Sequence, residues 1–363
     1  MRNVIHRMWR WLGVLGALTT VGGPIAAQTL RTIEVSSTPA CRGCSIELTR
    51  IASLGRVTDA ELLGPHSYDV ATVGRGGYVA AASTLDRLLV YDSAGTLIRT
   101  VGRRGQGPGE FTVIRNIRVG NGDTVYVADG GQPVRVLSPV LEHRRSMPSA
   151  RALDAPGALQ RTAFLRTGEI LVQTTPNTIQ VLRADGATVR SLAIPVTGGD
   201  RPCAGCERRW LAPAREAGRF WSTVSNRYEI DQFDLQGRHH LRLVRRASWF
   251  EPWRALTGDR PTPYARAIRE DSEGLLWVQT IVPDPAPRPL SPAESTRVLY
   301  PAMLGRLWDG VLEVIDPRSG ALLASRRLPE YFDFVGGDLL VTSNEDADGI
   351  VTMHVWRAAF RRP

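Results

Sequence analysis

The chain has 363 residues, 43% hydrophobic and 22% charged, so it can bury a sizeable core as two or three domains or as one large β fold. Its 35 glycines and 24 prolines are too many for a helical bundle and normal for β structure rich in turns. The formal net charge is +9, and all 45 basic residues are arginines. Because the arginines are spread along the chain, the charge indicates a solvated surface, with a preference for anionic partners as the alternative.

Residues 1–27 have the pattern of a secretory signal peptide. A basic start with Arg2, Arg7 and Arg10 precedes the apolar run WLGVLGALTTVGG and the small residues of PIAAQ. The alternative is a transmembrane anchor, but the run is shorter than the roughly 20 residues that a span needs. We therefore predict cleavage near Ala27, which lowers the net charge from +9 to +6, and a periplasmic or secreted mature chain with no stable membrane insertion. Export also argues against a nucleic-acid partner.

One apolar strand pattern recurs six times, with starts 46 to 63 residues apart. Alternating residues, β-branched side chains and Gly/Asp turns are signals of strands and hairpins. The six copies are GYVAAAS at 77–83, DTVYVAD at 123–129, EILVQTT at 169–175, RFWSTVS at 219–225, LLWVQTI at 275–281 and DLLVTSN at 338–344. One strand precedes each copy and two usually follow it, and four-stranded units of this length arranged around an axis make an all-β propeller.

The two ends of the chain predict how the ring closes. The last unit is one strand short, and the segment SIELTRIASLG at 45–55 is a strand without a unit of its own. An open ring would leave an exposed strand edge, so we expect this segment to complete the last blade. The prediction is a six-bladed β-propeller over 45–363 as a single domain, after an N-terminal lead over 28–44; seven blades is the alternative.

The segment VGRRGQGPGEF at 101–111 has two interpretations. Its glycines suggest a phosphate-binding loop, but such a loop needs a helix after it and a Lys-Ser/Thr pair, and here a strand pattern follows and lysine is absent. In the propeller it is the joint between the first two blades. Glycine and proline suit a sharp crossing there, and Phe111 is expected to pack between the blades.

This joint, together with the strands after it, resembles an NHL repeat. The resemblance rests on the glycine-rich lead ending in Phe111, then IRNIRVGNGDTVYVADGGQPVRVLS, and it covers residues 101–140; the other units are degenerate. As a whole the chain is similar to exported bacterial six-bladed propellers of the NHL-like type, including the short CxxC before the first strand. The resemblance implies the fold and no single activity, because NHL-type propellers include binding scaffolds and lyases.

The four cysteines form two CxxC pairs. These pairs are Cys41 with Cys44 and Cys203 with Cys206. One zinc site built from all four thiolates is disfavoured, because the pairs are far apart in the chain and on different sides of the predicted ring. In an oxidising compartment we expect two local disulfides, with free or redox-active thiols and a metal site as the alternatives.

The candidate ligand-binding residues lie at the channel mouth and on the loops of one face. They are Arg103, Arg104, Arg115, Asn116, Arg161, Trp249, Trp253, Tyr264, Arg266, Tyr331 and Asp333, with His66 and Tyr68 also at starts of inner strands. Arginine and tyrosine outnumber carboxylates and histidines in this set, which suits a polar or anionic ligand. It suits Ca²⁺ poorly, since that ion needs roughly six or more oxygens. The alternative is that the loop aromatics simply pack beneath the loops.

Two functions follow from these observations. The first is an exported, non-catalytic scaffold that binds a protein or a polar ligand in the cell envelope, without a metal or cofactor. The second is a lyase or lactonase of the NHL type with Ca²⁺ or Zn²⁺ in the channel, for which only the scattered His66, Asn116 and Asp333 offer ligands. The neighbours His239 and His240 point to opposite faces of a strand, so we do not expect them to share a metal.

Overall fold

The structure is a computed structural model. It describes residues 30–64, 69–74, 76–82, 85–130, 132–147, 153, 159–195, 208–253, 262–287, 305 and 307–363. Within these residues the chain forms 25 strands and two short 3-10 helices, η1 (Asn121–Asp123) and η2 (Leu159–Arg161). No helix in this part of the chain is long and apolar enough to cross a membrane.

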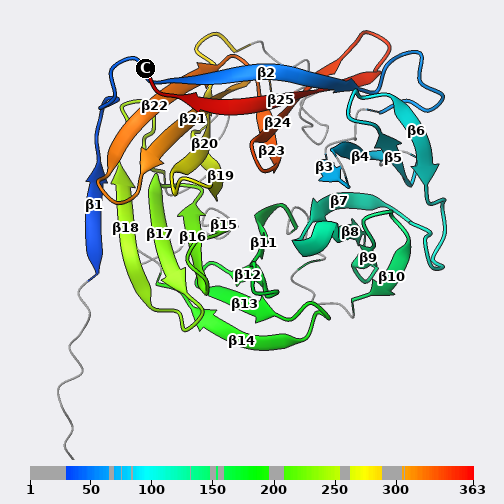
Figure 1. The fold of residues 1–363 in the computed structure, drawn as a ribbon, viewed down its shortest axis with the longest axis horizontal. Helices are drawn as coiled ribbons and strands as arrows, with labels where there is room; N and C mark the ends of the chain where they lie inside the picture. The colour runs from blue at the N-terminus through cyan, green and yellow to red at the C-terminus, as the bar shows by residue number, and fades with distance from the viewer. Residues whose placement is uncertain are drawn as a thin grey trace, which may run out of the picture.

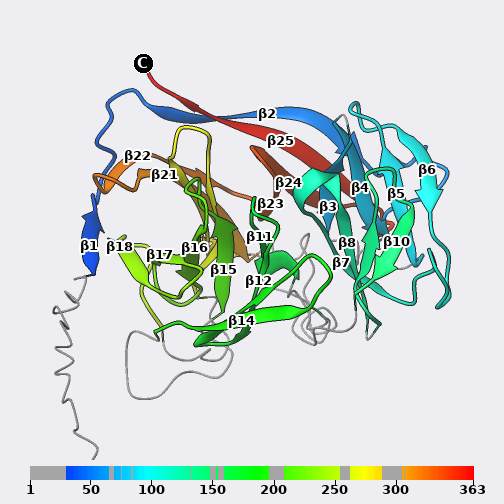
Figure 2. The same cartoon turned by 60° about the horizontal axis from the view of Figure 1, so that its bottom comes forward.

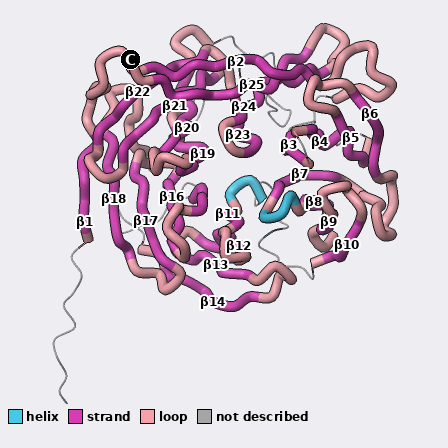
Figure 3. The backbone as a smooth tube through the Cα atoms, in the orientation of Figure 1, coloured by secondary structure: helices cyan, strands magenta, loops and turns pink. Residues whose placement is uncertain are grey.

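Six sheets are arranged around a common axis, as Figures 1 and 3 show, and we call the region around this axis the channel. Blade 1 contains β3 (Val70–Val73), β4 (Gly77–Ala82), β5 (Arg87–Tyr91) and β6 (Leu97–Val101). Blade 2 contains β7 (Ile114–Val119), β8 (Val125–Asp129), β9 (Arg135–Leu137) and β10 (His143–Ser146). Blade 3 contains β11 (Ala163–Phe164), β12 (Ile170–Thr175), β13 (Thr178–Leu182) and β14 (Thr188–Ala193).

The second half of the chain repeats the arrangement. Blade 4 contains β15 (Arg209–Pro213), β16 (Arg219–Val224), β17 (Glu229–Asp234) and β18 (His239–Arg245). Blade 5 contains β19 (Tyr264–Glu270), β20 (Leu276–Pro283), β21 (Trp308–Asp316) and β22 (Ala321–Leu328). Blade 6 contains β23 (Phe332–Gly336), β24 (Leu339–Glu345), β25 (Val351–Arg361) and β2 (Ser45–Leu54). The predicted six-bladed, all-β fold is confirmed, with the first strand of each blade nearest the channel.

The ring closes as predicted, by pairing the two ends of the domain. Strand β2 lies antiparallel to β25, with a register that runs from Ser45 opposite Arg361 to Leu54 opposite Met353. Figure 1 shows the blue and red strands side by side along blade 6. The outermost strand of this blade therefore comes from the start of the domain, and the other three come from its end.

Strand β1 (Arg31–Val35) is an element that the sequence did not predict. It pairs in parallel with β18 and makes blade 4 five-stranded, at the outer edge seen in Figure 2. The chain then crosses to blade 5, where the backbone N–H of Ser36 donates to Gly320 and the N–H of Leu322 donates to the Ser36 hydroxyl. The N-terminal lead thus contacts blades 4 and 5 before β2 enters blade 6.

The hydrophobic core lies between the blades, because each sheet buries both faces against its neighbours. The six buried apolar clusters of the described residues each span one interface between adjacent blades. The cluster between blades 1 and 2 contains Phe111, which is completely buried, together with Val79 and Ile117. Phe111 therefore packs between the blades, as the sequence predicts. Burying a side chain of this size contributes about 1.5–3 kcal/mol to stability.

The glycine-rich joint before Phe111 is closed on itself. Gly102 has φ +90°, and a Cβ there would lie 2.4 Å from the Phe111 ring, so only glycine fits. Glu110 accepts hydrogen bonds from the backbone N–H of Gly107 (2.9 Å) and from Arg103 Nε (2.8 Å), and these two contacts lower the pKa of its carboxyl. Hydrogen bonds within the segment therefore hold it as a tight turn, and this turn places Phe111 at the interface between the blades.

The aspartate of the VAD sequence holds the end of this joint. Asp129 Oδ1 accepts from the backbone N–H of Thr112, from the Thr112 hydroxyl and from the N–H of Val113, all within 2.8 Å. Its Oδ2 lies 3.6 Å from Arg135 Nη2. The buried carboxylate therefore fixes the start of β7 against the end of β8.

Replacing Asp129 by alanine is expected to lower the free energy of unfolding by about 3 kcal/mol, because it leaves partly buried N–H groups without acceptors. The matched control is Asp185→Ala, since Asp185 accepts from the N–H of Ala187 in an exposed turn and its loss is expected to change stability by less than about 1 kcal/mol. Urea unfolding followed by tryptophan fluorescence measures both. Equal losses in the two variants would contradict the role assigned to Asp129.

Candidate functional site

The first residues of the inner strands surround one end of the channel, which we call the mouth. All six blades repeat the same strand order, so their inner strands run in the same direction. Four side chains from consecutive blades stand where these strands start: Arg161 before β11, Arg208 before β15, Tyr264 at the first position of β19, and Tyr331 before β23. The mouth therefore combines residues that are far apart in the sequence.

Arg266 and Asp333 form an ion pair between blades 5 and 6. Arg266 Nε lies 2.9 Å from Asp333 Oδ1 and Nη2 lies 3.2 Å from Oδ2, so the contact is bidentate. The guanidinium also stacks on Trp210, 4.7 Å from the ring centroid, and on Tyr331 at 5.5 Å. Burial alone would lower the pKa of Arg266, but Asp333 raises it, so this arginine is charged and held in one orientation.

The two tyrosines of the mouth are neutral hydroxyl groups. Burial raises the pKa of Tyr264, and it raises the pKa of Tyr331 well above its usual value. The Tyr331 hydroxyl donates to Asp333 Oδ1 at 3.4 Å. Both side chains can therefore act as polar contacts for a ligand without adding charge.

Arg161 and Arg208 supply charge that no described carboxylate pairs with. Arg161 is half-buried, and its Nε is buried without a hydrogen-bond partner among the described residues. Burial and the charges of Arg208 and Arg266 lower the pKa of Arg161 to about 10. Arg208 is exposed, but its carbonyl accepts from both the N–H and the hydroxyl of Ser225, which fixes its backbone.

The opposite side of the channel belongs to blades 1 and 2. Asp69, just before β3, accepts from the Asn116 amide at 2.8 Å and from the backbone N–H of Ile117 at 3.0 Å, and it lies 3.8 Å from Arg118. A narrow cavity connects this group to Tyr331 and Asp333. Asn116 is buried, and its amide joins the two blades.

The remaining predicted arginines are exposed. Arg103 and Arg104 follow the outer strand β6, with side chains 77% and 86% exposed, and contact Glu110 and Asp86. Arg115 is exposed at a bulge of β7.

The aromatic residues of the joint between blades 4 and 5 pack against the protein. Trp249 packs on Tyr228 and Phe250, and the Trp253 indole donates to the carbonyl of Pro263, next to Tyr264. His66 and Tyr68 lie outside the described residues.

The described residues contain no group of three or more His, Cys, Asp or Glu side chains able to hold a metal ion. His239 pairs with Asp231 and His240 pairs with Asp234, each at 2.9 Å, so the two rings have different partners. Ca²⁺ or Zn²⁺ in the channel therefore finds no ligand set in the part of the chain that the structure describes.

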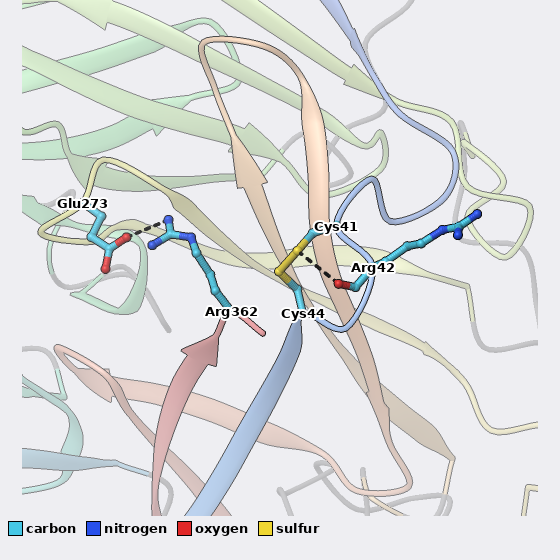
Figure 4. The surroundings of a disulfide bond; sticks show 5 residues. All are labelled: Cys41, Arg42, Cys44, Glu273 and Arg362. Carbon is cyan, nitrogen blue, oxygen red and sulfur yellow. Dashed lines mark hydrogen bonds and ion pairs between the residues drawn. A yellow bond between two sulfur atoms is a disulfide. The ribbon is translucent and has the colours of Figure 1, made fainter.

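Cys41 and Cys44 form the predicted local disulfide, just before β2 (Figure 4). The loop between them lies against the other end of the chain, since a Cβ on Gly43 would lie 3.4 Å from Pro363. The neighbouring Arg362 pairs with Glu273 of blade 5 at 2.9 Å. Cys203 and Cys206 lie outside the described residues, and their expected disulfide stays a prediction.

The six closed blades define the fold class of this protein as a six-bladed β-propeller. The family model DUF5128, described as a 6-bladed beta-propeller, matches residues 58–134, which span blade 1 and the start of blade 2. No curated protein matches the chain. The narrower NHL-type resemblance of residues 101–140 stays a prediction.

Solved structures support the fold. The chain is similar to a member of the DUF4221 family from Bacteroides vulgatus, with 12% identity, a TM-score of 0.60, and coverage of 88% of this chain and 99% of that one. It is also similar to a Bacteroides fragilis protein described as a candidate for export (10% identity, TM-score 0.48, 90% and 99% covered). A streptogramin B lyase aligns at 10% identity and TM-score 0.43, covering 87% and 98%. The likeness to the DUF4221 member supports the fold alone.

Proposed function

We propose that this protein is an exported, non-catalytic scaffold of the cell envelope that binds a polar or anionic ligand at the mouth of its channel. The observation that carries the proposal is the convergence of Arg161, Arg208 and Arg266 on one end of the channel, where Asp333 pairs with only one of them. Arginines held by packing and ion pairs are suited to binding through charge-assisted hydrogen bonds.

Export is proposed from the first 27 residues and is consistent with the disulfide. The basic, apolar and small-residue segments before Ala27 have the order of a secretory signal. The Cys41–Cys44 disulfide suits an oxidising compartment outside the cytoplasm. The arginine-rich mouth would then face ligands of the periplasm or the medium.

A non-catalytic scaffold is expected to purify with substoichiometric calcium and zinc and to leave an aryl-lactone probe intact. Elemental analysis of the mature protein measures the first property, and absorbance of the released phenol measures the second. The control is the same protein dialysed against EDTA and then reloaded with Ca²⁺ or Zn²⁺. Stoichiometric metal together with lactone turnover that EDTA abolishes would overturn the scaffold and favour the lactonase.

A further inference from the structure

We propose that the mouth holds a doubly negative oxyanion group, a phosphate, a sulfate or a pair of carboxylates on one molecule, between Arg161 of blade 3 and Arg208 of blade 4. The inference rests on the proposed function and names its ligand class and the position of the ligand. The position follows from how the charges of the mouth are distributed among the blades.

Arg161 and Arg208 make no ion pair with any carboxylate that the structure describes. Two other arginines near the channel each have a carboxylate partner. Arg266 makes a bidentate contact with Asp333, and Arg118 lies 3.8 Å from Asp69. Arg161 and Arg208 each lie at the start of an inner strand. The two positive charges of Arg161 and Arg208 match one group that carries two negative charges.

Asp333 decides on which side of the mouth the anion lies. It faces the channel from blade 6, and its carboxylate would repel a second anion beside Arg266. Asp69 has the same effect on the side of blades 1 and 2. Neither of these two carboxylates lies between blades 3 and 4, so an anion there gains the attraction of Arg161 and Arg208 without close repulsion from Asp333 or Asp69.

Arg161 is held in an arrangement that is unfavourable without a ligand. Its Nε is buried and lacks an acceptor among the described residues, and burial together with the nearby charges of Arg208 and Arg266 lowers its pKa to about 10. Like charges brought together in a partly buried site reduce the stability of the fold, and such sites are frequently functional. An oxyanion would accept from the orphaned N–H and compensate the repulsion.

The residues around the two arginines are already ordered for binding. Two hydrogen bonds from Ser225 fix the Arg208 carbonyl, and Trp210 is held between Ser225 and the Arg266 guanidinium. Guanidinium groups bind carboxylates, phosphates and sulfates through paired N–H donors, with a geometry that lysine lacks. The arrangement therefore favours planar or tetrahedral oxyanions over halide ions.

The test compares sulfate, inorganic phosphate, phosphoserine and succinate with chloride and acetate at equal ionic strength, using calorimetric titration and thermal unfolding. Dianions are expected to bind the wild-type protein and raise its melting temperature, and the monoanions to have little effect. Arg161→Met and Arg208→Met are each expected to weaken dianion binding at least about tenfold. Arg144→Met is the control, because it removes the same charge from an exposed position on β10.

A second readout separates loss of binding from loss of folding. Without a ligand, Arg161→Met is expected to melt at or above the wild-type temperature, because it removes an unpaired charge from the mouth. Equal stabilisation of wild type, both mouth variants and the Arg144 control would overturn the proposal, since sulfate and phosphate also stabilise proteins by exclusion from their surfaces.

A metal-free, inactive protein with no dianion binding would overturn only this inference, whereas metal-dependent turnover would overturn the scaffold function. Preference for phosphoserine or for succinate over inorganic phosphate would identify the source of the oxyanion.

Discussion

The Glu313→Gln variant is expected to lose about 3–5 kcal/mol of unfolding free energy, because the substitution leaves a buried guanidinium without its counter-charge. Glu313 of blade 5 is fully buried and accepts from Arg245 Nε at 3.2 Å and Nη2 at 3.1 Å. It also accepts from the Tyr228 hydroxyl at 2.7 Å. Both partners belong to blade 4, so one carboxylate satisfies two polar groups across the interface between the two blades.

The control for this variant is an ion pair of the same type on the surface. Glu47 pairs with Arg361 at 2.9 Å, with side chains 56% and 62% exposed, and Glu47→Gln is expected to lower stability by less than about 1 kcal/mol. Urea unfolding at neutral pH, followed by near-UV circular dichroism, compares the two. Similar losses in both variants would show that Arg245 finds another partner or water when Glu313 is neutral.

Replacing Tyr228, Arg245 and Glu313 together by apolar residues separates the cost of an unpaired buried charge from the cost of lost packing. The triple variant Tyr228→Phe, Arg245→Met and Glu313→Leu removes the charges and hydroxyl together and is expected to recover most of the stability lost by Glu313→Gln. The recovery would follow because the variant leaves no buried charge without its counter-charge at this position. A triple variant as unstable as Glu313→Gln would place the loss in side-chain packing instead.

The strands were predictable because their signals are local. Alternation of apolar residues and Gly/Asp turns recurs in each blade, and the missing strand of the last unit predicts the closure by β2. Strand β1 escaped prediction because Arg31–Val35 is short and mostly exposed, with a burial pattern that lacks a clear apolar face. Its partner β18 lies about two hundred residues later, and no local pattern encodes that parallel pairing.

The site was predictable only in part, for a related reason. The strand pattern predicts Arg161, Tyr264, Arg266, Tyr331 and Asp333 because they lie near the starts of inner strands, and the structure brings them to one mouth. The pattern does not identify Arg208 and Trp210, which hold the equivalent position of blade 4, because they directly follow the joint with the second CxxC. The bulge at Arg266 changes the alternation of β19 and directs this side chain to Asp333, which no strand pattern predicts.

Removal of β2 is expected to be more damaging than any single substitution. A chain that starts at Arg56 loses the outer strand of blade 6 and leaves β25 with an unpaired edge from Met353 to Arg361. It also loses Ile46, Ala52 and Leu54, which are buried in the clusters on both sides of the blade. Because domains have only about 5–15 kcal/mol of net stability, we expect no cooperative native state, and the open edge should cause aggregation. Size-exclusion chromatography and near-UV circular dichroism measure the two effects.

A shorter truncation isolates closure from the rest of the N-terminal lead. A chain that starts at Ser45 lacks β1 and the Cys41–Cys44 disulfide but keeps the whole register between β2 and β25. It is expected to stay monomeric and to unfold cooperatively at a lower temperature, because β1 pairs with the outer edge of blade 4 and adds Val35 to the core beside it, but takes no part in closing the ring. Adding a synthetic peptide of residues 45–55 to the longer truncation should restore part of the near-UV signal, since the missing strand is then supplied in trans. A monomeric, cooperatively folded chain starting at Arg56 would contradict this account, because blade 6 would then be stable with three strands and the ring would not depend on pairing its two ends.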